Sequence, residues 1–273
     1  MPEQSFQPPY EGSRVDHVGT WQRSLGVSLE RMFENALDWA HLPHLHASSF
    51  TSIVCLEAGP WGWRARATDS AGRESLLELR LSAAQRRWVT RNLEGPHAGA
   101  EIWTYVVERA AREIDVVVDF FVPGLAASAR ESVGRAYASL YATLYDEDEA
   151  MMVARQALLD RRVNPIPAAL APVNLGPAAE LRLPMPVRIG SRELLVVRSA
   201  NGYQALSARC PHMGAPLENA AIDAGEIVCP WHGFRFDVST GVCRKGMSGT
   251  LASGFGVSEV AGEVWVLPTE KQG

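Results

Sequence analysis

Two short segments of the chain, each with one cysteine and one histidine, constrain its fold more than any other feature. Cys210-Pro211-His212 is followed, after sixteen residues, by Cys229-Pro230-Trp231-His232. Thiolates and imidazoles are good metal ligands, and four cysteines in 273 residues are too few to build a disulfide scaffold. The C-terminal third must therefore fold so that two loops meet around a metal centre.

The pairing of ligand types in these loops bears on which metal they hold. Zn²⁺ accepts four such ligands in a tetrahedral site, but zinc fingers pair cysteine with cysteine and histidine with histidine. The mixed loops instead resemble the Rieske family, in whose [2Fe-2S] cluster two thiolates hold one iron and two imidazoles hold the other. The resemblance implies that the cluster ligands are Cys210, His212, Cys229 and His232.

The residues around these ligands indicate which type of Rieske protein the chain resembles. Membrane-bound respiratory Rieske proteins have an additional cysteine in each loop, forming a disulfide, and hydroxyl groups that bond to the cluster sulfurs. The equivalent positions of this chain hold Ala215, Trp231, Phe234 and Phe236. Fewer hydrogen bonds to sulfur stabilise the reduced cluster less, so a low potential of the ferredoxin or oxygenase type is implied. Cys55 and Cys243 lack a similar histidine pairing, and we interpret them as ordinary thiols.

A second set of ligand-type side chains lies between Glu34 and His46. Its spacing, N-x-x-D-x-x-H and then H after four more residues, resembles the mononuclear-iron motif of Rieske oxygenases. The resemblance implies that His41 and His46 bind iron, and that Asn35 and Asp38 support them.

The helix that carries this motif must be interrupted if its histidines are to converge. Residues five apart on a straight helix, as His41 and His46 are, diverge by roughly 140°. Ser28 is a good N-cap for this helix, and Pro43 is expected to end it because proline cannot donate to the helix ladder. His44 remains a competing ligand.

A 2-His-1-carboxylate iron site needs one more oxygen ligand. The acidic run 146–149, followed by Gln156, resembles the family's late motif, which is E-D with a glutamine about eight residues further on. Aligning Glu147 with that motif selects Asp148 as the third ligand, with Asp146 as the alternative. Three protein ligands on a roughly octahedral ferrous ion leave about three positions for water, dioxygen and an adjacent substrate.

The hydrophobic pattern changes along the chain. Residues 61–65 and 114–120 alternate apolar and polar side chains, as half-buried strands do. From about Ser128 apolar residues recur at helical spacing, and this pattern runs on to Leu158. Proline and alanine then dominate, as in a semi-rigid connector.

The C-terminal part shows short apolar strands, such as 194–197 and 264–267, with glycine-rich turns between them. We therefore expect an α+β chain. Residues 1–162 would form a catalytic domain with a helix-grip-like antiparallel sheet and a long C-terminal helix. A Pro/Ala-rich linker over 163–182 would lead to a small all-β Rieske [2Fe-2S] domain over 183–273.

Charge and hydropathy restrict the location and the partners. The chain has 26 basic and 31 acidic residues without a long run of one sign, which argues against nucleic acid as a partner. No apolar run is long enough to cross a bilayer, and the first ten residues lack the pattern of a secretory signal. We expect a cytoplasmic protein with no membrane partner.

The resemblance implies a Rieske non-haem iron monooxygenase with a [2Fe-2S] cluster and a mononuclear Fe(II). Electrons from NAD(P)H would arrive through a separate reductase or a ferredoxin, and O₂ would hydroxylate or dealkylate an apolar, aromatic or polycyclic small molecule. Two alternatives are a non-catalytic Rieske electron carrier fused to a ligand- or partner-binding domain, and a zinc-binding interaction protein. Candidates to receive an acidic electron donor are Arg209, Arg235, Arg244 and Lys245.

The order of the two motifs is reversed relative to the family, whose oxygenases place the Rieske domain first. In the family, an aspartate passes electrons between neighbouring subunits, bridging a cluster histidine and an iron histidine. These positions correspond to Asp38, His232 and His41, so the resemblance implies a homotrimer. A connector of about twenty residues at roughly 3.1 Å each can span about 60 Å, so transfer within one chain stays open.

Overall fold

The computed structural model describes residues 16–163 and 171–269. The chain forms two compact units, Met1–Val153 and Ala154–Gly273. The division falls inside helix α3 (Ala127–Val163), so the last residues of this helix belong to the second unit. The expected boundary at 162 lay near the end of the helix, because helical periodicity does not show to which unit a helical residue belongs.

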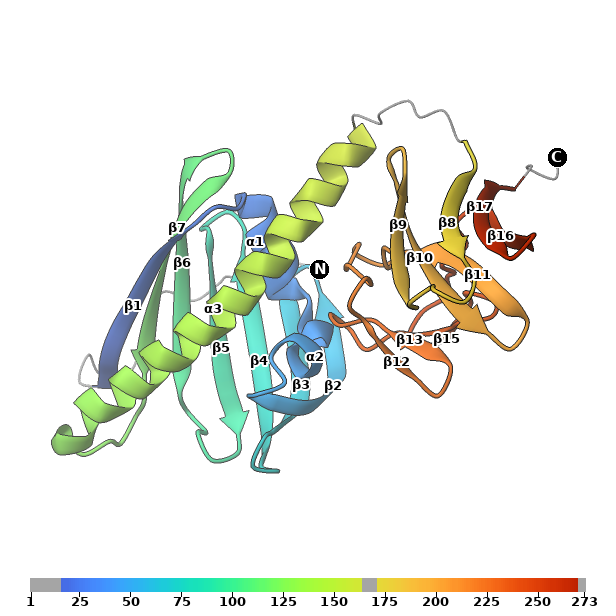
Figure 1. The fold of residues 1–273 in the computed structure, drawn as a ribbon. Helices are drawn as coiled ribbons and strands as arrows, with labels where there is room; N and C mark the ends of the chain where they lie inside the picture. Colours follow the sequence, from blue (N-terminus) through green and yellow to red (C-terminus); the bar gives the residue numbers. More distant parts are fainter. Residues whose placement is uncertain (1–15, 164–170, 270–273) are drawn as a thin grey trace. The chain divides into compact units, whose positions relative to one another are not determined.

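The first unit is built on one antiparallel sheet. In its described part, seven strands lie in the order β1-β7-β6-β5-β4-β3-β2 (Figure 1). Strands β2 to β7 follow one another as hairpins, and β1 pairs with β7. The strands are β1 (His17–Leu25), β2 (Phe50–Gly59), β3 (Gly62–Asp69), β4 (Glu74–Ser82), β5 (Arg87–Glu94), β6 (Glu101–Ala110) and β7 (Glu113–Phe121).

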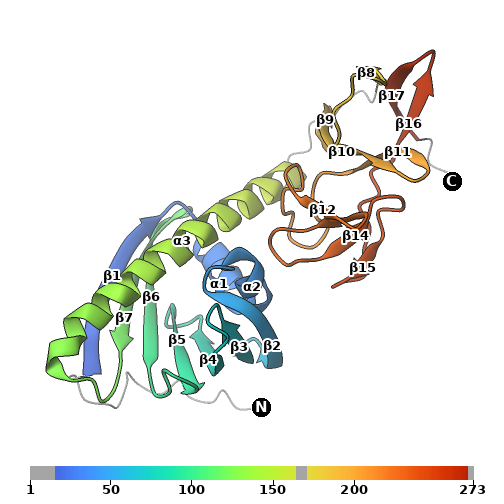
Figure 2. The same cartoon turned by 60° about the horizontal axis from the view of Figure 1, so that its bottom comes forward.

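Alternation along the strands gives this sheet one apolar face. On β7 the side chains of Val116, Val118 and Phe120 are fully buried, whereas Asp115 and Asp119 lie on the opposite face. Helix α3 crosses the apolar face (Figures 1 and 2) and packs aromatic rings against it. The expected strand over 114–120 and the long helix from about Ser128 are confirmed. Among the residues that the structure describes, no helix has the length and apolar composition needed to cross a membrane.

Helix α1 (Leu29–Leu37) begins where the sequence predicts. The Ser28 side chain accepts a hydrogen bond from Arg31 N at 3.3 Å, as an N-cap residue does. The helix is held on the sheet by Trp63 of β3, whose indole N–H donates to Ala36 O at 3.0 Å. The motif that follows α1 is therefore placed beside the apolar face.

The expected end of this helix at Pro43 is wrong. Helix α1 ends before Asp38, whose ψ of 78° is not helical, and η2 (Trp39–His41) and α2 (Leu42–Leu45) follow. Pro43 lies in the first turn of α2. Proline is tolerated there because a first-turn N–H has no partner within its own helix.

The second unit contains small antiparallel sheets. In its described part they have the orders β11-β10-β9, β12-β13-β14-β15 and β16-β17-β8 (Figure 2). The strands are β8 (Val173–Pro177), β9 (Met185–Ile189), β10 (Arg192–Ser199), β11 (Gly202–Ser207), β12 (Ala221–Asp223), β13 (Glu226–Val228), β14 (Arg235–Asp237), β15 (Cys243–Lys245), β16 (Phe255–Val260) and β17 (Glu263–Pro268). The expected strands over 194–197 and 264–267 lie in β10 and β17 and are confirmed.

Strand β8 falls within the span expected to be a linker. It pairs with β17 from Glu263↔Pro177 to Val266↔Val173, so residues from 173 onward belong to the folded unit. Proline is tolerated here because β8 is an edge strand, where one row of N–H groups has no partner in the sheet. The earlier part of the expected linker, 164–170, lies outside the described residues.

Candidate metal centres

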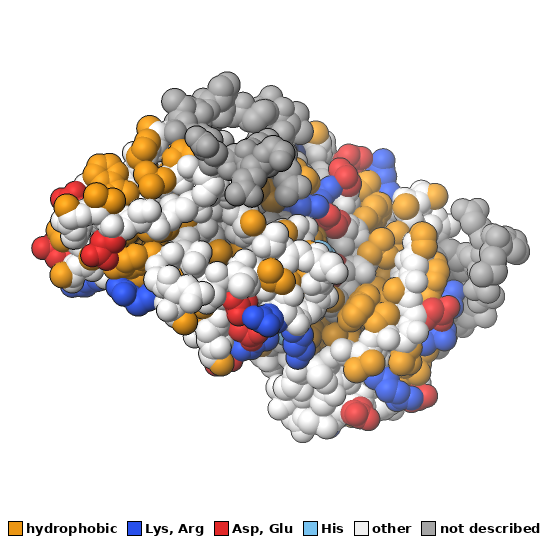
Figure 3. Space-filling model, turned by 90° about the vertical axis from the view of Figure 1, so that its right-hand side faces the viewer, with side chains coloured by type: hydrophobic (Ala, Val, Ile, Leu, Met, Phe, Trp, Pro, Cys, Tyr) orange, Lys and Arg blue, Asp and Glu red, His pale blue; other side chains and the backbone are white. Residues whose placement is uncertain are grey.

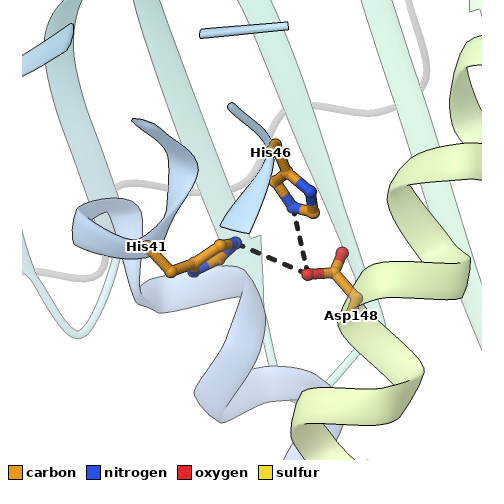
Figure 4. Close-up of side chains that lie close together, drawn as sticks. All are labelled: His41, His46 and Asp148. Atoms are coloured by element: carbon orange, nitrogen blue, oxygen red, sulfur yellow. Dashed lines mark ion pairs between the residues drawn. The ribbon is translucent and has the colours of Figure 1, made fainter. Parts of the chain in front are cut away.

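Three buried side chains of the first unit bring metal-binding atoms together (Figure 4). His41 ends η2, His46 follows α2, and Asp148 comes from α3. The ligand atoms all lie within 4.8 Å of one another, with His41 Nε2 3.5 Å and His46 Nε2 3.1 Å from Asp148 Oδ1. Two ligands each about 2.1 Å from one ion and at right angles lie about 3 Å apart, so this spacing fits a divalent cation.

The irregular backbone between His41 and His46 allows the two histidines to converge. The chain changes from α-helix to a 3₁₀ turn and then to a short second helix. The His41 and His46 rings therefore meet edge to face, with centroids 5.1 Å apart. The interruption that the sequence required is present, because the 3₁₀ turn ends at His41 and α2 ends at Leu45, before His46.

Neighbouring polar side chains orient this triad. Asn35 Nδ2 donates to Asp148 Oδ1 at 2.9 Å. Glu147 Oε2 lies 2.6 Å from His46 Nδ1, which turns Nε2 of that ring toward Asp148. Sequence analysis did not assign a role to Glu147. The residue gives no local signal, because it and His46 are 101 positions apart.

The other histidine of the triad, His41, is held less tightly than His46. Asp38 Oδ2 lies 3.6 Å from His41 Nδ1, beyond hydrogen-bond distance. Among the described residues, no hydrogen-bond partner of His41 Nδ1 is present. The expected supporting aspartate is therefore beside its histidine, but the structure does not show the hydrogen bond.

The charges at the triad favour a cation. Burial alone would lower the pKa of His46, but hydrogen bonds and charges from Asp148 and Glu147 outweigh burial and raise this pKa. The site therefore attracts a positive charge, supplied either by a proton on the imidazole or by a metal ion. Two imidazoles and one carboxylate are the donor set of non-haem Fe(II) oxygenase sites.

The two alternative ligands lie elsewhere. Asp146 has a side chain that is 66% exposed and forms an ion pair with Arg23 of β1. His44 is exposed on α2. Neither joins the triad, so the geometry favours Asp148 and His46.

In the second unit, the two Cys/His segments form loops with the same backbone pattern. The glycine four residues after each cysteine donates its N–H to the cysteine carbonyl, at 3.0 Å in the first loop and 2.9 Å in the second. These glycines, Gly214 and Gly233, have φ values of 88° and 62°, which few other residues adopt readily. Each loop is thereby closed tightly behind its two ligand side chains.

The four ligand side chains of these loops converge. The His212 and His232 rings have centroids 4.6 Å apart, and the sulfurs of Cys210 and Cys229 are hydrogen-bonded to each other. Hydrogen bonds from the Cys210 thiol and from His232 lower the pKa of Cys229 to about 5, against the effect of burial. Two sulfur and two nitrogen ligands with one easily formed thiolate fit a metal cluster.

The arginines expected to receive an acidic electron donor are already paired within the unit. Arg235 Nε donates to Glu226 Oε2 at 2.6 Å, and Arg244 Nη2 donates to Asp237 Oδ2 at 2.8 Å. Arg209 forms an ion pair with Glu193. On the face seen in Figure 3, blue and red side chains stand in small mixed groups rather than in one positive patch. The pairs weaken the positive field that an acidic donor would meet.

Comparison with known proteins identifies the second unit. Residues 172–251 match the family model of the Rieske [2Fe-2S] domain. Ferredoxin CarAc from Metapseudomonas resinovorans is 32% identical over 84 residues, which make up 31% of this chain and 78% of that protein. The chain belongs to the Rieske [2Fe-2S] family. The matched residues include both Cys/His loops, so the Rieske domain of this chain supports a [2Fe-2S] cluster and electron transfer.

Other relatives match this Rieske protein over shorter stretches. Mouse Apoptosis-inducing factor 3 is 42% identical over 55 residues, which are 20% of this chain and 9% of that protein. The 4beta-methylsterol monooxygenase of Methylococcus capsulatus is 36% identical over 52 residues, which are 19% of this chain and 14% of that protein. The chain thus spans a small part of the length of these relatives.

Proposed function

We propose that this protein is a Rieske non-haem iron monooxygenase with a helix-grip-like catalytic domain. Three buried ligand atoms lie within 4.8 Å of one another in a unit outside the matched Rieske domain, and this observation carries the proposal. An electron carrier does not need such a site. The proposed cluster ligands are Cys210, His212, Cys229 and His232, and the proposed ligands of a mononuclear Fe(II) are His41, His46 and Asp148.

The residues around the triad have separate tasks in this proposal. A ferrous ion held by two histidines and one carboxylate supplies dioxygen activation. Glu147 orients His46, and Asn35 fixes the Asp148 carboxylate through the hydrogen bond to Oδ1. Asp38 lies beside His41 and is the proposed link through which an electron from a Rieske histidine reaches the site.

The proposed partners follow from the same resemblance. They are O₂, an apolar aromatic or polycyclic substrate, and a reductase or ferredoxin that takes electrons from NAD(P)H. A homotrimer that passes electrons between subunits, and a location in the cytoplasm, belong to the same proposal.

The rival function is a Rieske electron carrier whose first unit binds a ligand or a partner protein. Metal content separates the two, because the oxygenase holds about three irons per chain and the carrier about two.

The purified protein should be red-brown with a rhombic EPR signal when the cluster is reduced. Pre-reduced protein is then screened with candidate substrates and exposed to oxygen, with mass spectrometry of products. Two irons per chain after anaerobic loading with Fe(II) would favour the carrier.

Glu147→Gln should weaken metal binding at the triad without removing it. Glutamine has nearly the same shape as glutamate but lacks the charge that holds a proton on His46 Nδ1. Losses of such outer partners typically weaken metal affinity 10–100-fold. The measurement is the dissociation constant of Co²⁺ or Fe(II) at the triad, obtained by competition with a chelator, with the cluster monitored by its absorbance.

Glu149→Gln is the matched control, since Glu149 lies on the same helix but pairs with Arg23 and accepts from Gly26 N. It should change the metal affinity much less than Glu147→Gln does. Equal dissociation constants for the two variants would mean that Glu147 does not orient a ligand.

A further inference from the structure

Three tyrosines of α3 lead away from Asp148 along one side of the helix. Tyr145, Tyr141 and Tyr137 precede Asp148 by three, seven and eleven residues. Residues at such spacings share one helical face, so the tyrosines and the carboxylate form one stripe toward the sheet. Tyr145, which adjoins Asp148, is 4% exposed.

The rings of this stripe contact one another and two rings of the sheet. Trp21 of β1 lies 4.8 Å from Tyr145 between centroids, and Tyr141 lies 6.1 Å from Tyr145. Phe120 lies 5.1 Å from both Tyr137 and Tyr141. We call these five residues the aromatic row. It begins one helical turn from Asp148 and reaches half-buried Trp21 on an edge strand of the sheet.

Packing alone does not require every one of these side chains to be tyrosine. Burial raises the pKa of both Tyr141 and Tyr145, so each phenol stays protonated inside the unit. The Tyr145 hydroxyl has a hydrogen-bond partner in Thr104, whereas phenylalanine at position 141 would fill nearly the same space without the cost of burying a hydroxyl group. Phenol and indole rings are much easier to oxidise than the ring of phenylalanine.

We infer that the aromatic row removes oxidising equivalents from the triad when no substrate consumes them. This further function rests on the proposed iron site. Tyr145 is the first donor because it is the ring next to Asp148, and Trp21 is the exit because its ring contacts Tyr145 and it lies half-buried on an edge strand of the sheet. A thiol or ascorbate in solution then returns the row to its resting state.

The electrons balance with hydrogen peroxide as the oxidant. Peroxide takes up two electrons and two protons and becomes two molecules of water. With Fe(II) held by His41, His46 and Asp148, one electron would come from the metal, which would become ferric, and the Tyr145 ring supplies the other. The phenolic proton and one proton from solvent complete the water. An electron from Trp21 then refills the Tyr145 ring, which recovers its proton.

The test uses the full chain, loaded with Fe(II) and with its cluster oxidised, mixed with hydrogen peroxide in the absence of substrate. Freeze-quenched samples are examined by EPR for tyrosyl and tryptophanyl radicals, and peptides are mapped for oxygen added to His41 and His46. The wild type should give an aromatic radical, whereas Asp148→Ala should give none. Tyr145→Phe and Trp21→Phe should reduce the radical yield and increase the oxidation of the two histidines several-fold.

Tyr105→Phe is the matched control, because Tyr105 is a half-buried tyrosine of β6 whose ring contact is with Trp103 rather than with the aromatic row. It should behave as the wild type. Wild-type protein that binds no Fe(II) at the triad would overturn the proposed function and this inference together. If iron binds and peroxide is consumed, but both row variants match Tyr105→Phe in radical yield and histidine oxidation, the inference alone is overturned.

Discussion

Asp148→Ala is expected to release the proposed mononuclear iron and abolish the proposed oxygenase turnover while leaving the [2Fe-2S] cluster in place. Asp148 Oδ1 lies within 3.5 Å of the Nε2 atoms of both imidazoles, at 3.5 Å from His41 and 3.1 Å from His46. Alanine removes the carboxylate ligand, and the two remaining histidines are too few protein ligands to hold Fe(II) firmly. The cluster should survive because its loops lie in the other unit.

The same substitution should also lower the stability of the metal-free protein. The buried Asn35 amide loses its acceptor, which costs about 1–3 kcal/mol. Iron per chain, the reduced-cluster EPR signal and the thermal unfolding midpoint are measured together. In the double variant Asn35→Leu/Asp148→Ala no buried amide is left without an acceptor. The part of the stability loss that comes from the Asn35 amide should therefore be smaller in that double variant.

Asp146→Ala is the control for this experiment, because Asp146 is exposed and paired with Arg23, which also contacts Glu149. It should keep the iron and the turnover of the wild type. An empty triad in Asp146→Ala with an occupied one in Asp148→Ala would show that the wrong carboxylate has been assigned.

Cys229→Ser is expected to eliminate the cluster and its colour. The pKa of Cys229 is lowered to about 5, so this side chain readily forms the thiolate that binds iron. Cys229 is also only 1% exposed, so solvent water cannot take the place of a missing sulfur ligand. A serine hydroxyl has a much higher pKa than a thiol and binds iron–sulfur centres poorly. The variant should lose about two irons per chain, the visible absorbance and the reduced-state EPR signal.

The triad should still bind one Fe(II) in this variant, so electron delivery would stop although the iron remains. Cys243→Ser is the matched control, since the Cys243 thiol contacts Lys245 O on β15 and lies outside the two loops. It should retain absorbance and EPR signal. Loss of the cluster in Cys243→Ser, with a normal cluster in Cys229→Ser, would require a different ligand set.

Local patterns in the sequence were enough to predict several of the helices and strands. The alternation over 114–120 and the helical periodicity after Ser128 correspond to β7 and α3, because each depends on which face of one element is buried. The helix start at Ser28 also depends on neighbouring residues alone, since the cap bonds to Arg31. The end of that helix did not follow, because Pro43 is compatible both with stopping one helix and with starting another.

The sequence by itself determined several regular elements and the presence of a Rieske domain, whose Cys/His pairs lie within two short loops. It also limited the third metal ligand to a short acidic run. Only the tertiary structure placed Asp148, rather than Asp146, beside the two histidines, and it alone showed Glu147 beside His46 and the aromatic row beside Asp148. The physical reason is sequence distance. Asn35 and Asp148 are 113 positions apart, and such side chains meet only when α3 lies across the sheet and buries one face of its helix.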